Sequence, residues 1–269
     1  MKTVKILAVI VSLFCACSTF AQLDLINVSD TFIANDNSSS GVSATSPQGS
    51  ATSLSMRVYP ASSRLRMTVV SFDLSDLTGS FSGAELQFDF LSAQHNTRTI
   101  NLLGVGPSYE SESTVNESTL DYANAPFILS PNDGGPAYNG GQFQFVGGAL
   151  NTLPTTLGDS INDGSGNLVV ENLASFSNPS ASTGVKTFSG TTLEDFLAND
   201  QNGGWVTFII ANTPNSSDSA YTIASKEDTT DNSPIQLILP DATMVPEPSI
   251  LALLGLGLFG LMARLRRKM

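Results

Sequence analysis

The sequence predicts an all-β domain, a β-sandwich of jelly-roll type, in the central part of the chain. Hydrophobic side chains there alternate with a period of two, as expected of strands that bury one face, and not with the 3.6-residue period of a helix. The alternating runs are short and lie between clusters of Gly, Asn, Asp, Ser and Pro, a pattern typical of sandwiches and jelly rolls. A single segment has a helical pattern.

Nine runs of this kind are predicted to be strands. They are residues 56–59, 66–73, 84–90, 99–103, 168–171, 185–188, 205–211, 221–224 and 235–239. A further short strand is expected at residues 142–145, inside the glycine-rich region 130–148. Residues 35–53 are dense in Ser, Gly, Asn and Thr, so we expect an exposed loop there.

The one predicted helix covers residues 191–198. Thr191 or Thr192 can cap its N-terminus, because a threonine hydroxyl accepts a hydrogen bond from a free backbone N–H of the first turn. Glu194 lies near the capped end, where acidic side chains are favoured.

The N-terminus has the pattern of a secretory signal peptide. Lys2 and Lys5 form a basic start, residues 6–14 are apolar, and residues 19–21 form a small-x-small cleavage site. We therefore expect residues 1–21 to be removed by cleavage after Ala21.

Both cysteines of the chain, Cys15 and Cys17, lie within this predicted signal peptide. The mature protein is then expected to have no disulfide, no thiolate nucleophile and no cysteine-bound zinc. An alternative is a lipoprotein anchored at Cys17, but Phe14 stands where such signals usually have Leu.

The C-terminus has three consecutive features. Pro246-Glu247-Pro248 separates the body from an apolar run at residues 250–263, and residues 264–268 contain four basic side chains. The apolar run is shorter than the ~20 residues of a relaxed membrane-spanning helix. Basic residues stay on the cytoplasmic side of a bilayer, however, which would leave the body outside the cytoplasm.

This arrangement resembles the PEP-CTERM sorting signal of exported bacterial proteins. The resemblance implies that an exosortase, a membrane-embedded cysteine peptidase, recognises Pro246, Glu247 and Pro248 and removes the tail. The alternative is an ordinary C-terminal anchor that stays in place. The expected organisation is a signal peptide at 1–21, the β domain at 22–243 and the sorting signal, with its hydrophobic helix, at 244–269.

The body is strongly acidic. The two ends contain six of the 12 Lys and Arg residues, whereas nearly all of the 24 Asp and Glu residues lie between them. Binding to nucleic acid needs clustered basic side chains, so we exclude it, and docking on anionic lipid is disfavoured for the same reason. An acidic surface is compatible with solubility outside the cell, with calcium binding, or with contact to a neutral or cationic matrix.

Short blocks along the body carry a second resemblance. They are residues 30–33, 64–66, 71–77, 82–88, 117–126, 224–227 and 233–237. In this order they are similar to the DNRLRE family of extracellular jelly-roll domains, some of which are described as carbohydrate-binding modules. Val115 and Tyr122 stand where that family usually has tryptophan. The resemblance implies a jelly-roll fold across the body and contact with a carbohydrate.

Sugar binding needs aromatic rings that lie flat on an accessible face. Tyr59 and Tyr109 are the predicted carbohydrate-binding residues. Trp205 is expected to fill the core of the sandwich, and Tyr122 to pack beneath the long loop.

Calcium is the candidate cofactor, and no other is expected. Asp159 and Asp163 belong to an oxygen-rich loop that ends at Gly164, and oxygen atoms are the ligands that calcium prefers. The spacing is not that of an EF-hand, and a plain turn is the alternative. Asp228, Asp231 and Asn232 form a similar, weaker candidate.

No catalytic residues are predicted. His95, the single histidine, lies in a polar hairpin and is expected to be an exposed turn residue. Glu110, Glu112 and Glu117 could supply carboxylates to a hydrolase, but their serine-rich surroundings favour a solvated loop.

The sequence therefore predicts a non-catalytic exported surface or extracellular-matrix protein that contacts exopolysaccharide. Its expected partners are the export machinery, an exosortase-type peptidase and, before processing, the inner membrane. Two alternatives remain: a polysaccharide-active enzyme, either a carboxylate-based hydrolase or a lyase, and a purely structural matrix protein without a specific ligand.

Overall fold

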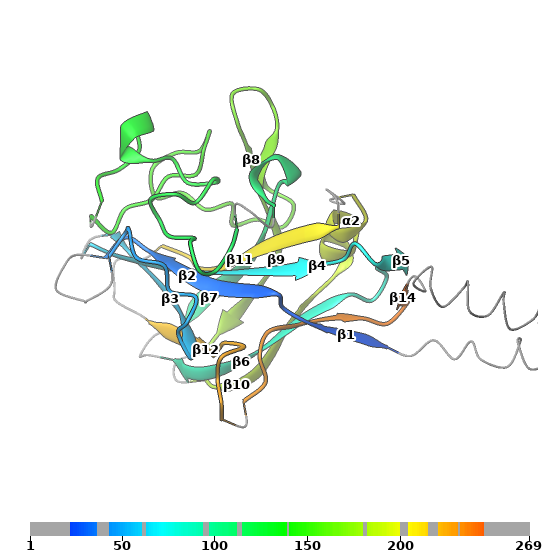
Figure 1. Cartoon of the computed structure of the whole chain (residues 1–269). Helices are drawn as coiled ribbons and strands as arrows, with labels where there is room; N and C mark the ends of the chain where they lie inside the picture. Colours follow the sequence, from blue (N-terminus) through cyan, green and yellow to red (C-terminus); the bar gives the residue numbers. More distant parts are fainter. Residues whose placement is uncertain are drawn as a thin grey trace, which may run out of the picture.

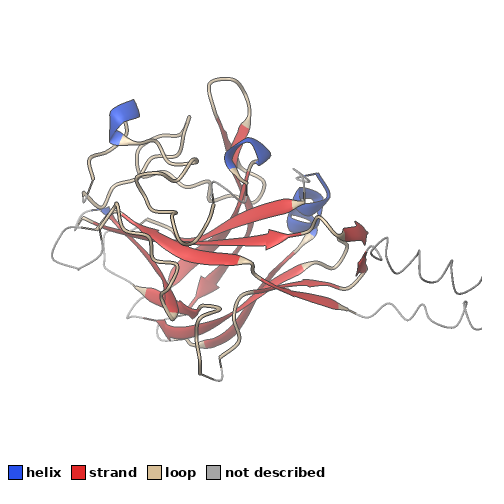
Figure 2. Cartoon of the chain, in the orientation of Figure 1, coloured by secondary structure: helices blue, strands red, loops and turns tan. Residues whose placement is uncertain are grey.

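The computed structural model describes residues 22–36, 43–60, 63–93, 97–111, 115–138, 140–179, 182–199, 204–214, 220–230 and 232–244. Strands dominate the described part of the chain (Figures 1 and 2), where they make up 44% of the structure beside one helix. An average soluble protein has about half that share of strand. The prediction of an all-β domain is confirmed.

Most of the elements along the described part of the chain are strands, and helical segments are few. The strands are β1 (Leu23–Ile26), β2 (Ser29–Ala34), β3 (Ser53–Tyr59), β4 (Arg64–Asp73), β5 (Leu77–Gly79), β6 (Glu85–Ala93), β7 (Arg98–Val105), β8 (Ser160–Asn162), β9 (Leu168–Asn178), β10 (Gly184–Ser189), β11 (Trp205–Asn212), β12 (Tyr221–Ala224), β13 (Gln236–Leu239) and β14 (Ala242–Met244). The helical segments are the short η3 (Pro107–Tyr109) and η4 (Pro131–Asp133) and the α-helix α2 (Thr191–Asn199).

Twelve strands form one antiparallel network in the order β1-β13-β6-β12-β3-β4-β11-β7-β9-β8, with β10 on β6 and β2 on β4. The network changes layers at β3, whose first residues pair with β12 and whose last three pair with β4. We name the β1, β6, β10, β12 and β13 side layer A, and the β2, β4, β7, β8, β9 and β11 side layer B. Separately, β14 pairs with β5.

The larger hydrophobic core lies between the two layers. Phe72 and Phe208 of layer B stack edge-on at 6.1 Å between ring centroids, and Phe88 and Phe90 of layer A do so at 5.3 Å. The helix α2 adds the buried side chains of its apolar face to the same core. Burying such aromatic side chains stabilises the fold by roughly 2 kcal/mol each.

A second core covers the other face of layer B. Strand residues such as Val69 and Ile209 pack there against Tyr122, Phe127 and Phe143 from the long loops between β7 and β8. In Figure 1 these loops, drawn in green, lie over layer B. Because layer B is covered on both faces, β4 and β11 have long buried runs in place of strict alternation.

All nine predicted strands overlap observed strands, but the pattern missed β1, β2, β5, β8 and β14. The expected strand at residues 142–145 is wrong, because among these residues only Phe145 forms a bridge, to Ile128. In β2 every described side chain is buried, including Asp30 and Thr31, so no polar and apolar alternation marks it.

The exposed loop expected at residues 35–53 is partly wrong. Asn35 and Asp36 are fully buried at its start. The Asn35 side chain donates hydrogen bonds to the carbonyls of Ala137 and Gln142 at 3.2 and 2.7 Å, which ties this loop to the loops over layer B. Residues 37–42 lie outside the described residues.

The predicted helix is confirmed, but neither Thr191 nor Thr192 is the residue that precedes it. The helix begins at Thr191, and the carbonyl of Gly190 accepts a hydrogen bond from the backbone N–H of Glu194 at 3.2 Å. Gly190, which has a φ of 134°, is therefore the residue before the helix.

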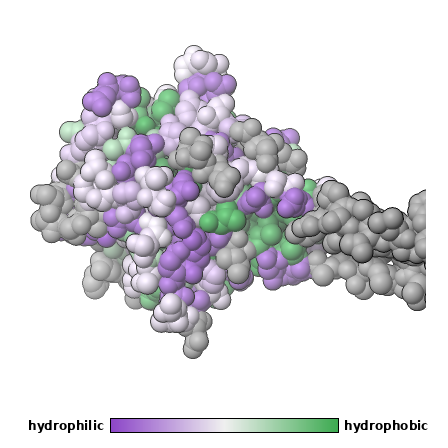
Figure 3. Space-filling view, viewed as in Figure 1, coloured by the Kyte–Doolittle hydropathy of each residue, from purple (hydrophilic) through white to green (hydrophobic). Residues whose placement is uncertain are grey.

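The visible face of the domain in Figure 3 is mainly hydrophilic or neutral, with small hydrophobic areas. Within the described ranges, no helix has the length and apolar character needed to cross a membrane. The predicted signal peptide with Ala21 and the tail with Pro246, Glu247 and Pro248 lie outside those ranges.

Candidate functional site

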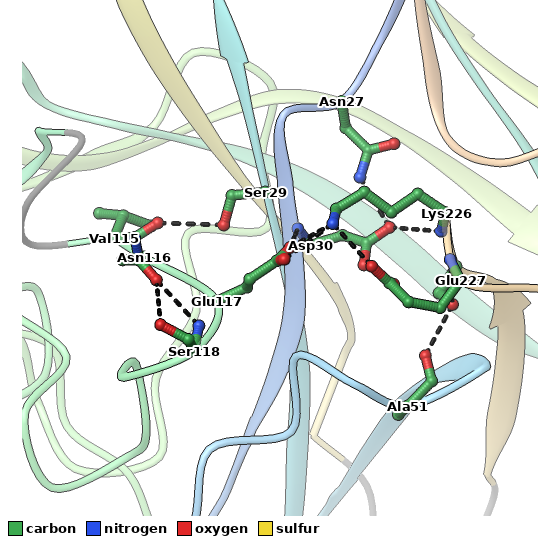
Figure 4. Close-up of polar contacts among 11 residues, drawn as sticks. Asn27, Ser29, Asp30, Ala51, Val115, Asn116, Glu117, Ser118, Lys226 and Glu227 are labelled. Atoms are coloured by element: carbon green, nitrogen blue, oxygen red, sulfur yellow. Dashed lines mark hydrogen bonds and ion pairs between the residues drawn. The ribbon is translucent and has the colours of Figure 1, made fainter.

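Three carboxylates from distant parts of the chain meet in one place (Figure 4). Asp30 lies on β2, Glu117 in the loops after β7, and Glu227 in the turn after β12. One carboxylate oxygen from each lies within 4.8 Å of the other two. We call Asp30, Glu117 and Glu227 the acidic cluster; within the described part of the chain, it is the group of side chains placed to hold a metal ion.

Asp30 is the buried centre of the cluster, with no exposed surface. Its Oδ2 accepts hydrogen bonds from Asn27 Nδ2 at 2.6 Å and from the backbone N–H of Lys226 at 2.8 Å. Burial of the carboxyl group, together with the negative charge of Glu227, raises the pKa of Asp30 to about 7 in spite of these two donors.

Two hydrogen bonds hold the loop segment around Glu117 against the start of β2. The backbone N–H of Asp30 donates to Glu117 Oε2 at 3.1 Å. Two residues before Glu117, the carbonyl of Val115 accepts a hydrogen bond from the Ser29 hydroxyl at 3.1 Å. The start of β2 therefore fixes both the backbone and the carboxylate of this loop.

Lys226 places its ammonium group between two members of the cluster. Its Nζ lies 2.8 Å from Glu117 and 2.6 Å from Glu227. Burial alone would lower the pKa of Lys226, but the hydrogen bonds to Glu117 and Glu227 outweigh it and raise that pKa. The turn itself is fixed by Ser225, whose hydroxyl donates to the carbonyl of Ala51 at 2.6 Å and accepts from the backbone N–H of Glu227 at 3.2 Å.

A surface depression of about 380 Å³ leads to the cluster. Glu117 and Glu227 line it together with Pro47, Gly49, Ser50 and Ser118. Water and small ions can therefore reach the two outer carboxylates, while Asp30 lies behind them.

The sequence pattern does not predict this cluster as a site; of its three members only Glu117 is a candidate from sequence, as a catalytic carboxylate. No local pattern marks the cluster, because Asp30, Glu117 and Glu227 lie far apart in the sequence and only the fold brings them together.

Two predicted site residues contact each other. The hydroxyl of Tyr109 donates to Asp163 Oδ2 at 2.6 Å. Asp163 also accepts from Asn167 Nδ2 and from the backbone N–H groups of Ser165 and Asn167, at 2.8 to 2.9 Å. Its carboxylate thus closes the turn after β8, and the exposed Asp159 lies outside these contacts.

The hydrogen bonds of this turn and the burial of Tyr109 shift two ionisation equilibria in opposite directions. Burial, followed by the hydrogen bond to Asp163, raises the pKa of Tyr109 to about 12. The hydrogen bond from Tyr109, followed by those from Asn167, lowers the pKa of Asp163 well below its usual range.

The other aromatic candidates lie in different environments. Tyr59 is half-buried at the end of β3, opposite Arg64 in the sheet. Tyr122 is buried in the second core and donates to the carbonyl of Gln142 at 3.0 Å, which confirms its predicted packing role. Trp205 is only partly buried and is not a member of either core, so its predicted core-filling role is wrong.

The remaining candidates are only partly described. His95, Glu112 and Asp231 lie outside the described residues. Glu110 is buried, contrary to the expected solvated loop. Asp228 accepts hydrogen bonds from Thr230 and Asn232 within its own turn, and these bonds lower its pKa.

A second depression, of about 240 Å³, lies between η3, β9 and α2. Glu171 and Asp195 both line it, next to Phe196. Burial, followed by the charge of Asp195, raises the pKa of Glu171.

The comparisons with known proteins concern the tail. No curated protein shows significant similarity to the chain. The family model described as the PEP-CTERM protein-sorting motif matches residues 245–268, the segment that contains Pro246, Glu247 and Pro248. The chain therefore carries a PEP-CTERM sorting motif, which indicates an exported protein with a transiently membrane-anchored C-terminus that is processed by exosortase-type machinery.

Proposed function

We propose that the protein is a non-catalytic component of the cell surface or extracellular matrix, and that its β domain contacts exopolysaccharide. The observation that carries this proposal is the sorting motif at residues 245–268. In this proposal a signal peptide ending at Ala21 starts export, and the body is a DNRLRE-like domain of jelly-roll type. The tail holds the chain in the inner membrane until it is cut.

Two features of the body support contact with a carbohydrate. Tyr59 and Tyr109 are both partly accessible. The hydrogen bond from Tyr109 to Asp163 holds the ring in one orientation, so little side-chain entropy remains to be lost when a sugar stacks on it.

The delivery step is tested by replacing Pro246, Glu247 and Pro248 together with alanine. We expect the variant to fold but to stay in the membrane fraction at its unprocessed mass, because proline keeps this segment extended and accessible to a peptidase. If the variant reaches the surface or medium with the same trimmed C-terminus as the wild type, the motif does not direct processing.

Carbohydrate contact is tested by pull-down of the processed protein, recovered from the cell surface, with exopolysaccharide. Tyr109→Ala should weaken retention, whereas Tyr109→Phe, which keeps the ring, should weaken it less. Tyr138→Ala is the matched control, since Tyr138 is also a half-buried loop tyrosine. Equal retention of all variants would contradict carbohydrate contact through Tyr109 and would favour the alternative, a structural matrix protein without a specific ligand.

One observation favours the enzyme alternative. Glu171 and Asp195 line the same depression, and the raised pKa of Glu171 is what a carboxyl group needs to act as a general acid near neutral pH. A reducing-sugar assay on exopolysaccharide separates the two functions. A polysaccharide-active enzyme would release reducing ends, and Glu171→Gln would abolish the release.

A further inference from the structure

Two carboxylate oxygens of the acidic cluster have no hydrogen-bond donor among the described residues. Asp30 is fully buried, and its Oδ1 lacks a partner. Glu227 Oε2 is also buried without a partner. Figure 4 shows the carboxylates of Asp30 and Glu227 facing each other. Two buried carboxylate oxygens that face each other without a donor are costly when both groups are ionised, so this arrangement favours either a proton on Asp30 or a metal cation between the two groups.

The spacing of the cluster fits calcium. Calcium binds oxygen at about 2.3 to 2.6 Å, so two oxygens on one ion lie at most about 5 Å apart. The three carboxylate oxygens lie within 4.8 Å of one another. Three carboxylates and water from the adjoining depression can supply the six to eight oxygens that calcium takes.

The charges of the site point the same way. Three carboxylates face one ammonium group, that of Lys226, which leaves an excess of two negative charges when all are ionised. The Lys226 side chain is 22% exposed. Because its stem is flexible, the ammonium group can move to solvent when another cation arrives.

We infer that Asp30, Glu117 and Glu227 form a calcium site that Lys226 occupies in the metal-free protein. The ion links β2, the loops after β7 and the turn after β12, which the fold joins across as many as 196 residues of sequence. Because calcium must displace the ammonium group, its affinity falls in the weak range of extracellular modules, with a Kd of about 0.1 to 1 mM. With this affinity, the site binds calcium after the protein has been exported.

The test uses the full-length chain in mild detergent, first freed of metal with a chelator. At about 10 mM calcium we expect the melting temperature to rise by about 3 °C or more, since the ion binds only the folded state. Magnesium at the same concentration should produce a smaller rise, because it requires a tighter octahedral shell. Equilibrium dialysis should find calcium bound at one site in this affinity range.

Three variants locate the site. Glu227→Gln and Glu117→Gln, both at partly exposed side chains, should each weaken calcium binding by about tenfold or more. Asp163→Asn, in the other acidic loop, is the matched control and should bind calcium like the wild type. Binding that is lost in Asp163→Asn and kept in both glutamine variants would overturn the inference.

The Lys226→Met variant tests whether calcium displaces the Lys226 ammonium group from the acidic cluster. If calcium replaces Lys226, this variant should be less stable without calcium, bind calcium more tightly than the wild type, and recover stability when calcium is added. The inference is overturned if calcium neither binds nor stabilises the wild type. It is equally overturned if Lys226→Met is destabilised to the same extent with and without calcium.

Discussion

Gly49 lies directly against the backbone of Glu117. A Cβ atom added at position 49 would overlap the carbonyl oxygen of Glu117 and come within 2.7 Å of its Cβ. The loop before β3 therefore approaches the acidic cluster so closely that only glycine fits.

Gly49→Ala should destabilise the protein by about 1 to 3 kcal/mol, because the overlapped atoms belong to backbone that cannot move cheaply. Urea denaturation measures the change. Gly164→Ala is the control, since a Cβ there meets nothing within 4 Å and should cost little. Equal effects of the two substitutions would show that the contact at Gly49 is not tight.

Asp36 should be among the most sensitive carboxylates to replace. It is fully buried, its Oδ1 accepts the backbone N–H of Leu65 at 2.8 Å, and its Oδ2 accepts from Arg66 through Nε and Nη2 at 2.8 and 2.7 Å. Asp36→Ala leaves a partly buried guanidinium without its partner, so we expect a loss of about 3 to 5 kcal/mol. The exposed Asp24→Ala should change the unfolding free energy by about 0.5 kcal/mol or less.

The ionisation of Tyr109 gives a prediction at high pH. Its pKa of about 12 in the folded protein lies above the ordinary value near 10. Between these values the unfolded chain has released the proton and the folded chain has not, so the stability contributed by Tyr109 falls as pH rises from about 10 to about 12.

Ultraviolet titration of the phenolate checks this directly. Asp163→Asn should move the pKa of Tyr109 part of the way back, since the negative charge is removed and the hydrogen bond to a neutral amide oxygen is weaker, but the burial remains. The Tyr109→Phe variant, which has no ionisable hydroxyl at this position, identifies the part of the absorbance change that comes from Tyr109. An unchanged titration curve in Asp163→Asn would show that the contact does not persist in solution.

Gly104 and Phe196 should show energetic coupling. A Cβ at position 104, in β7, would overlap the ring of Phe196 on α2. Gly104→Ala should therefore cost about 1 to 3 kcal/mol by overpacking. Phe196→Leu makes room for the methyl group, so the double mutant should be more stable than the sum of the two single changes predicts. If the unfolding free-energy changes of the two single substitutions simply add in the double mutant, the contact between Gly104 and Phe196 is contradicted.

Much of the β structure could be predicted from local pattern. Nine strands and α2 could be predicted from patterns within a few residues, although β4 and β11 turn out to have long buried runs in place of strict alternation. The pattern failed where burial comes from other parts of the fold. In β2, the polar Asp30 is buried because Glu117 from the loops after β7 and Lys226 from the turn after β12 both contact it. The strand expected at residues 142–145 is replaced by a bridge from Phe145 to Ile128, because the second core holds this segment by packing.

The functional residues, too, were predictable from the sequence only in part. The tail was predicted from sequence because a sorting motif is a contiguous signal, and the family model matches it. The sequence predicts separate roles for Tyr109 and Asp163, whereas in the structure the two side chains are hydrogen-bonded to each other. No local pattern could reveal this contact, since the two residues are 54 positions apart.

By itself, the sequence determined the all-β character of the body, its acidic charge and the sorting motif at its end. Each depends on composition or on residues adjacent in the chain. Only the tertiary structure decided that layer B is buried on both faces, and that Asp30, Glu117 and Glu227 meet around Lys226. Hydrogen bonds to Asp30 and Lys226 span 87, 109 and 196 positions, and such pairings depend on which strands lie side by side. Strand order is set by the packing of the whole domain, which short-range periodicity does not encode.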